Sequence, residues 1–394
     1  MQATFPLFFE MMAFISAIYR VQTVGLNPLE LILLGTMLEG AAFLFEIPTG
    51  IVADLYSRRA SVIIGYLVIG AGFVLEGALA WFPTVLLAQA VWGIGYTFIS
   101  GAQDAWLADE IGEAQLGQTY LRGAQMARVA GLVGLAASVG LGRVALHLPI
   151  LIGGLLIMGL GIFLWLFMPE TGFNPTPQPE RNTWQKMSFT FRDGLSVVRG
   201  SSVLLLILGI EAVYGLTSEG PDRLQEAHFL ENFSFPEWGG LDVVIWFGLL
   251  RVAQMVLGLV ITAVIQRNVD VDQEKTAVYL QYAFNSLMAV GLIGFGVTSR
   301  LGIALAMVLM YRSIRDTNDP IFTAWLSKKI EPRVRATVLS MGSQVNALGQ
   351  VIGGPIIGVV GVAYGLPTAF VVVGVALAPI VLLFGLTLRR TDNR

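Results

Sequence analysis

Long apolar runs alternate with short polar, glycine-containing or proline-containing breaks along nearly the whole chain of 394 residues. A helix that crosses the hydrocarbon layer of a membrane needs about 20 mainly apolar residues. Twelve runs meet this requirement, at residues 5–24, 29–53, 61–80, 84–107, 121–146, 149–168, 202–230, 242–266, 276–298, 301–326, 336–361 and 368–388. The pattern predicts an all-α integral membrane protein with twelve transmembrane helices, and we expect the seventh to be broken near Pro221.

The longest polar stretch, residues 169–200, separates the sixth run from the seventh and is rich in proline and charge. This composition is typical of a surface linker, with a short amphipathic helix expected around residues 184–198. The chain is thus predicted to comprise an N-terminal six-helix bundle (1–168), a cytoplasmic linker (169–200) and a C-terminal six-helix bundle (201–394).

The two halves share short sequences at a constant spacing. Trp106, in the tripeptide AWL, recurs 219 positions later as Trp325, also in AWL, and Gly134 recurs as Gly353. We therefore expect two pseudo-symmetric bundles, a plan found in transporters whose parallel halves are related by an axis along the membrane normal.

The composition agrees with a membrane protein and excludes several functions. Hydrophobic residues make up 55% of the chain and charged residues 13%, with a mean hydropathy of +0.72, whereas soluble domains carry about 25% charged residues. There is no cysteine, so disulfides and thiol chemistry are excluded. The net charge of −3, without a basic run, indicates no nucleic-acid partner. No Walker sequence indicates ATP-driven pumping.

Lysine and arginine are unevenly distributed between the two sets of loops. If both termini are cytoplasmic, the outer loops hold only Arg143, Arg223 and Arg300, with Arg20 near the first of them, and the inner loops hold most of the remainder. The positive-inside rule therefore predicts a multi-pass protein of the cell (inner) membrane with cytoplasmic N- and C-termini.

The sequence GIVADLYSRR, Gly50 to Arg59, lies between the second and third runs. Its spacing of Gly50, Asp54, Arg58 and Arg59 resembles the signature of the major facilitator superfamily, and EIPTGIVADLYSRR resembles the form found in drug-efflux-like branches of that family. The resemblance implies a major facilitator fold and a monomeric secondary active transporter that works by alternating access. It also implies proton-coupled export of amphipathic drug-like compounds or metabolites.

In that family this cluster forms a conformational latch, and the resemblance implies the same here. Gly50 would let helices two and eleven approach closely, and Asp54 would face the positive end of a helix dipole. Arg58 and Arg59 would form charge pairs, with Asp109 as the matching acid at the inner end of span four. The alternative is that both arginines merely fix the topology.

Ionisable residues inside a membrane usually face a cavity or a partner. Glu10, Glu46, Asp104 and Arg128 lie within roughly 7 to 13 Å of the inner ends of their predicted helices. They are the candidates for proton coupling, with Asp104 first. The alternative is that they form internal ion pairs, such as Asp104 with Arg128.

A second charged set lies in the C-terminal half, where the four charged residues on span ten recur at spacings that confine them largely to one helix face. The substrate-cavity candidates are Glu211, Glu219, Asp222, Arg223, Arg251, Arg312, Arg315 and Asp316, with Asp319 on the same face of span ten. Because His147 and His228 belong to no ligand cluster, we expect no metal and no cofactor.

Two departures from the family pattern weaken the case for proton antiport: Gln89 stands where many proton-coupled relatives have arginine, and span five lacks the Gly-Pro of antiporters. One alternative is a transporter of a carboxylate-type anionic metabolite, because arginines are numerous among the intramembrane charges. Another is a non-transporting membrane receptor. The expected partners are a small-molecule substrate, protons and the lipid bilayer.

If Asp104 carries protons, Asp104→Asn is expected to abolish gradient-driven transport while the protein still folds and inserts, because the amide cannot release a proton. Proton-driven uptake into vesicles, alongside membrane insertion of the variant, measures this. Undiminished transport would remove Asp104 from the mechanism.

Overall fold

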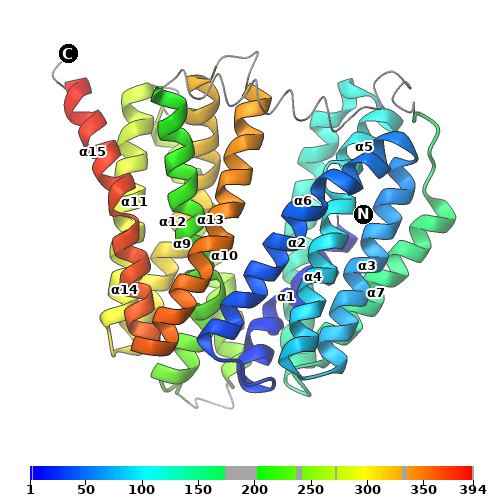
Figure 1. Ribbon diagram of the computed structural model, residues 1–394, viewed down its shortest axis with the longest axis horizontal. Coiled ribbons are helices and arrows are strands. Elements are labelled where there is room, and N and C mark those ends of the chain that lie inside the picture. Colours follow the sequence, from blue (N-terminus) through cyan, green and yellow to red (C-terminus); the bar gives the residue numbers. More distant parts are fainter. Residues whose placement is uncertain (2, 174–201, 237–241, 271–272, 331–334, 393–394) are drawn as a thin grey trace. The chain divides into compact units, whose positions relative to one another are not determined.

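The computed structural model describes residues 1, 3–173, 202–236, 242–270, 273–330 and 335–392. Two compact units form, one before and one after the segment 174–201, in which their boundary falls. Each unit is a bundle of long helices (Figure 1). The predicted amphipathic helix at 184–198 lies outside the described residues.

The N-terminal unit contains seven helices in the described residues: α1 (Thr4–Gln22), α2 (Pro28–Leu55), α3 (Arg58–Ala78), α4 (Phe82–Ile99), α5 (Ala102–Ile111), α6 (Glu113–Gly142) and α7 (Leu148–Phe167). The described part of the C-terminal unit also contains seven: α9 (Ser202–Asn232), α10 (Val243–Asn268), α11 (Glu274–Val297), α12 (Leu301–Lys329), α13 (Arg335–Tyr364), α14 (Leu366–Ala376) and α15 (Ala378–Asp392).

These helices confirm the predicted all-α fold with twelve spans. Within the described residues, ten spans are long and apolar enough to cross a membrane, with α4 and α5 counted as one span and α14 and α15 as another. The remaining two, α9 and α12, are 31 and 29 residues long. Together they carry more charged residues than the other helices of the C-terminal unit.

The helix breaks differ from those predicted. α9 continues through Pro221 as one helix, so the predicted break there is wrong. Span four is instead interrupted between α4 and α5, where Gly101 has a φ of +72°, a conformation that glycine adopts without strain. Arg58 and Arg59 form the first turn of α3, so only Tyr56 and Ser57 separate α2 from α3.

Polar caps explain why several helices begin where they do. Asn27 and Glu30 form a reciprocal capping box at the start of α2, where Pro28 occupies the first turn. The side chain of Ser57 accepts a hydrogen bond from the backbone N–H of Ala60 in α3, and Asp242 caps α10 in the same way. Hydropathy alone does not register such polar ends.

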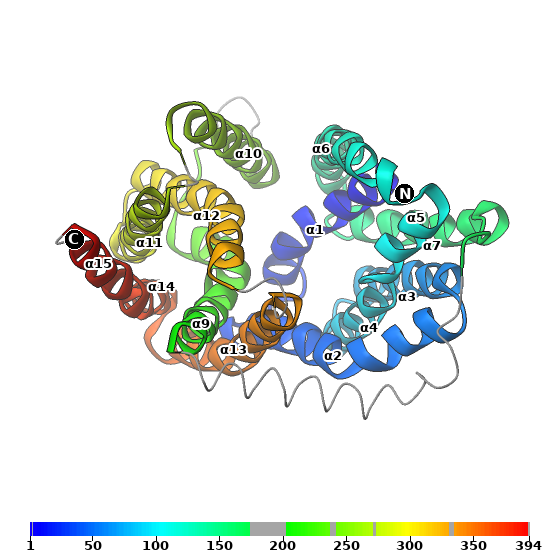
Figure 2. The ribbon, with the colours of Figure 1, turned by 90° about the horizontal axis from the view of Figure 1, so that it is seen from above.

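The two units repeat the same helix packing. α1 packs on α6 and α9 on α13, while α4 packs on α2 and α3 as α12 packs on α10 and α11 (Figure 2). A Cβ built on Gly154 would lie 2.9 Å from the carbonyl oxygen of Gly70. One built on Gly374 would lie 3.0 Å from the carbonyl oxygen of Ala289, the residue 219 positions after Gly70.

Close backbone approaches between α1 and α6 and between α9 and α13 involve the glycines that the sequence repeat pairs. A Cβ on Gly134 would lie 2.2 Å from the carbonyl oxygen of Leu7 in α1, and one on Gly353 would lie 2.6 Å from that of Leu216 in α9. Small residues let membrane helices pack backbone to backbone. The matched pairs support the predicted pseudo-symmetry.

We expect Gly134→Ala to destabilise the protein by about 1–3 kcal/mol, because the new methyl group meets backbone that has no rotamer to escape into. Gly131→Ala, one turn earlier on α6, is the control, since nothing lies within 4 Å of its Cβ position. The melting temperature of the purified protein in detergent measures both. Equal melting temperatures would show that α1 and α6 move apart without cost.

Candidate functional site

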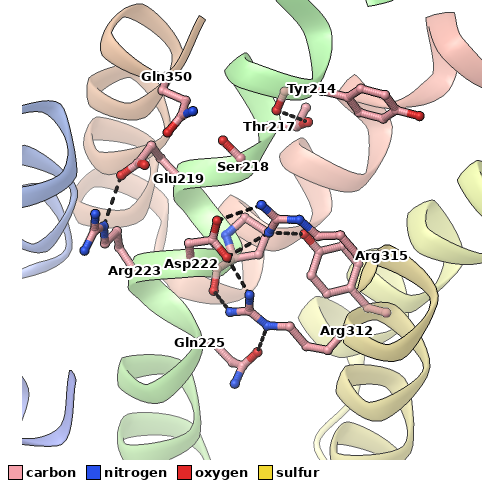
Figure 3. Close-up of polar contacts among 12 residues, drawn as sticks. Tyr214, Thr217, Ser218, Glu219, Asp222, Arg223, Gln225, Arg312, Arg315 and Gln350 are labelled. Atoms are coloured by element: carbon pink, nitrogen blue, oxygen red, sulfur yellow. Dashed lines mark hydrogen bonds and ion pairs between the residues drawn. The ribbon is translucent and has the colours of Figure 1, made fainter. Parts of the chain in front are cut away.

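An ion-pair cluster joins α9 to α12 in the C-terminal unit (Figure 3). The Arg315 guanidinium donates to both oxygens of Asp222, at 2.8 and 2.9 Å. Arg312 donates to Asp222 Oδ1 at 2.5 Å, to the side chain of Gln225 at 2.8 Å and to the backbone carbonyl of Pro221 at 2.8 Å. Arg312 and Arg315 are three residues apart and therefore reach the same carboxylate from one face of α12.

A cavity of about 300 Å³ lies beside this cluster. It is lined by residues of α9, α11, α12 and α13 and by Leu377 between α14 and α15. Its polar lining consists of Glu211, Tyr214, Thr217, Ser218, Asp222, Tyr311, Arg315, Asn318, Asp319, Thr323, Asn346 and Gln350. Met288, Leu292 and Phe322 supply apolar wall.

Hydrogen bonds fix the polar wall of the cavity. Asn346 donates to Glu211 Oε2 at 3.0 Å, and Gln350 donates to the side-chain oxygen of Asn346 at 2.9 Å. Tyr214 donates its hydroxyl to Asn285 at 2.9 Å and accepts from Asn318 at 3.3 Å. The cavity therefore has a polar surface that is held in place by neighbouring helices.

The predicted substrate residues separate into two groups. Glu211, Asp222 and Arg315 line the cavity, and Arg312 binds Asp222 next to it. The others do not line the cavity. Glu219 and Arg223 pair with each other at 3.2 Å on the other side of α9 (Figure 3), and Arg251 and Asp316 are exposed on α10 and α12. Asp319 lines the cavity as well.

In the N-terminal unit, the predicted pair of Arg58 with Asp109 is present, and Arg58 also donates to the carbonyl of Ala105 at 3.1 Å. Arg59 donates to the backbone carbonyl of Trp165 at the end of α7. The signature thus ties the start of α3 to α5 and α7. Within this unit, nothing lies within 4 Å of a Cβ on Gly50.

Asp54 is exposed, and within the described residues the structure gives it no hydrogen bond or ion pair. The close approach proposed for Gly50 to the eleventh span and the helix N-terminus proposed to face Asp54 stay predictions.

Two glutamates next to the signature were missed from the sequence. Glu170 accepts hydrogen bonds from the hydroxyl of Ser57 at 2.7 Å and the backbone N–H of Arg59 at 2.9 Å, in the first turn of α3. Glu110 accepts from the hydroxyl of Thr171 at 2.7 Å and from the backbone N–H of Gly172 at 3.0 Å. The sequence PETG directly after span six was the available signal.

Within the described residues, no hydrogen bond or ion pair joins any two of Glu46, Asp104 and Arg128 to each other. Glu46, exposed on α2, accepts from the hydroxyl of Ser100 at 3.4 Å. Asp104 accepts from the hydroxyl of Tyr120 at 3.0 Å. Arg128 is exposed on α6, and within the described residues no ion pair links it to Asp104, contrary to the alternative offered above. Glu10 lies half-buried on α1.

A buried charged cluster, also missed from the sequence, joins α1, α3 and α4. Arg20 donates to both oxygens of Glu76, at 2.8 and 3.0 Å, and Gln89 donates to the same carboxylate at 2.9 Å. Glu76 is fully buried. Gln89 on α4 thus binds a glutamate whose arginine partner comes from α1. Glu76 within the apolar run 61–80 was the signal.

Spans built as two matching bundles, with buried ion pairs and a polar cavity inside one bundle, define a membrane transport protein. Within the described residues no group of histidine and acidic side chains is placed to hold a metal ion.

Comparison with known proteins agrees with this class. Residues 2–346 match the Major Facilitator Superfamily, and the chain belongs to that family. It is 26% identical over 379 residues to the uncharacterized MFS-type transporter YxaM of Bacillus subtilis (strain 168). The match covers 93% of this chain and 89% of that protein. The protein is therefore a multi-pass membrane transporter and not an enzyme.

Solved structures share the fold at low sequence identity. A variant of the nucleoside transporter NupG is 14% identical, with a TM-score of 0.73 over 97% of this chain and 98% of that one. A bacterial homolog of the human lysosomal transporter Spinster, inward-facing and unoccupied, is 14% identical, with a TM-score of 0.74 over 98% and 95%. A POT peptide transporter in complex with sulfate is 13% identical, with a TM-score of 0.71 over 99% of this chain and 94% of that one.

Asp222→Asn is expected to destabilise the protein by about 1–3 kcal/mol, because it leaves two arginines without their shared anion. This is below the cost for a fully buried pair, since the three side chains are 20–31% exposed. Asp316→Asn, exposed on α12 beside the two arginines, is the control and should change stability by less than about 0.5 kcal/mol. Chemical denaturation in detergent compares the two, and equal stabilities would contradict the assigned role of Asp222.

Proposed function

We propose that this protein is a secondary active transporter that works by alternating access and that the cavity between α9, α11, α12 and α13 receives its solute. The observation that supports this proposal is the cavity, which is large enough for a small molecule and combines a mainly polar wall, held by hydrogen bonds, with a few apolar side chains. Transporters of this plan change access by moving one bundle against the other.

We further propose that protons drive transport and that the direction is export. Export rests on the resemblance of the sequence EIPTGIVADLYSRR to drug-efflux-like branches. Asp104, Glu46 and Glu10 remain the candidates to carry protons, and the pair of Arg58 with Asp109 supports a latch at the cytoplasmic end of the N-terminal unit. The proposed setting is a monomer in the inner membrane with both termini in the cytoplasm.

The cavity favours polar or cationic compounds over the anionic metabolite considered from the sequence. That alternative depended on Arg128, Arg251, Arg312 and Arg315. Arg312 and Arg315 both bind Asp222, and neither Arg128 nor Arg251 lines the cavity. Membership of a transporter family likewise leaves the receptor alternative without support.

Inverted membrane vesicles that contain the protein and are acidic inside are expected to accumulate fluorescent cationic compounds more than anionic ones. Discharging the proton gradient should abolish the accumulation, because proton exit then no longer drives solute entry. Asp54→Asn should lower it several-fold by weakening the latch, whereas Glu231→Gln, exposed near the end of α9, should leave it unchanged.

No gradient-dependent accumulation of any compound would contradict proton-driven export. Accumulation that is equal in the wild type and Asp54→Asn would remove Asp54 from the latch while leaving export in place.

A further inference from the structure

We propose that Glu211 and Asp319 together bind an ammonium group, so that the solute of this transporter is a small organic amine. The inference rests on the proposed function in one respect, which is that the C-terminal cavity is taken as the solute site.

The charges that line the cavity are unequal. Three carboxylates, Glu211, Asp222 and Asp319, face a single cationic lining residue, Arg315. Arg315 donates two hydrogen bonds to Asp222 and a third to the hydroxyl of Tyr311 at 3.1 Å. The hydrogen-bond donors of Arg315 are therefore engaged by Asp222 and Tyr311. Because Arg312 shares Asp222, the two arginines and Asp222 keep one net positive charge, and adding Glu211 and Asp319 leaves one negative charge in excess for a cationic solute to balance.

Neither remaining carboxylate is saturated by the protein. Glu211 accepts one hydrogen bond, from the amide of Asn346 to Oε2, and a carboxylate accepts up to about four. Asp319 accepts none from the described residues. The two carboxylates also repel each other through their charges. A cation between them relieves this repulsion.

A third acceptor lies in the same cavity wall. Asn318 is 1% exposed, and its Oδ1 has no hydrogen-bond partner, although its amide nitrogen donates to the hydroxyl of Tyr214. An unpaired buried acceptor costs free energy until a donor reaches it. A primary ammonium group has three N–H donors and no acceptor, which matches two carboxylates and one amide oxygen.

The rest of the cavity suits the carbon skeleton of such a molecule. Met288, Leu292 and Phe322 provide apolar contact, and the volume of about 300 Å³ limits the solute to a small molecule. Ser218 and Gln350 offer further hydrogen bonds for a hydroxyl or amide elsewhere on the solute (Figure 3).

The test measures binding to the full-length protein, purified in detergent, from the rise in melting temperature with ligand concentration at neutral pH. The probes form matched sets: putrescine, tyramine and glucosamine, their alcohol counterparts 1,4-butanediol, tyrosol and glucose, and the carboxylates succinate and 4-hydroxyphenylacetate. We expect saturable stabilisation by at least one amine and none by its alcohol counterpart or the carboxylates. The N-trimethyl form of that amine should bind more weakly, because it keeps the charge but has no N–H donor.

Glu211→Gln and Asp319→Asn should each weaken binding of that amine about tenfold or more, the effect of losing a charge-assisted hydrogen bond. Glu231→Gln on α9 and Asp316→Asn on α12 remove a carboxylate from the same helices outside the cavity and should keep the wild-type affinity. Because Asp319 is exposed, Asp319→Asn is expected to fold. If Glu211→Gln does not fold, Asp319→Asn alone provides the test.

The proposal is wrong if no amine binds, if an alcohol or carboxylate binds as tightly as its amine, or if the folded cavity variants keep full affinity. Because no gradient is involved, this outcome is separate from that of the vesicle experiment. Amine binding without accumulation would contradict proton-driven export alone, and accumulation of only neutral or anionic compounds would contradict the amine site alone.

Discussion

The attraction between one carboxylate, Asp222, and two guanidinium groups, Arg312 and Arg315, makes the C-terminal bundle possible in a membrane. α9 and α12 carry more charged residues than the other helices of the C-terminal unit together, and isolated charges at their centres would be expensive in lipid. By facing each other, the two helices turn those charges into hydrogen bonds. The same contact decides the chemistry of the adjoining cavity, since it uses both arginines and leaves acidic groups on the wall.

The N-terminal bundle uses the same principle with different partners. Arg20 and Glu76 neutralise each other in the interior, while Arg58 and Asp109 do so at the end of α3. The two bundles share their helix order and their glycine contacts but differ in where charge is buried. The described cavity with several polar groups belongs to the C-terminal unit, which is consistent with two related halves that have taken on different tasks.

Much of the fold was predictable because a membrane imposes a minimum length and an apolar composition on every span. The pair of Arg58 with Asp109 was also predictable, since it accompanies a recognisable signature. The partner of Glu76 was not, because nothing in the sequence brings residue 20 near residue 76 before α1 and α3 are packed. For the same reason the sequence identified Arg312 and Arg315 as candidates for the site, but it could not show that both form ion pairs with Asp222. Helix ends were missed wherever polar side chains cap or continue a helix.

Pro221 has a mechanical consequence for α9. A proline supplies no backbone N–H, so α9 lacks the hydrogen bond that residue 221 would donate to the carbonyl of Thr217, a residue in the cavity wall. Bending stiffness is therefore lowest beside the cavity, between Glu211 on one side and the anchored Asp222 on the other. A small change in the curvature of α9 there moves Glu211 relative to α12 without breaking a helical hydrogen bond, so the width of the cavity and the shape of the helix vary together.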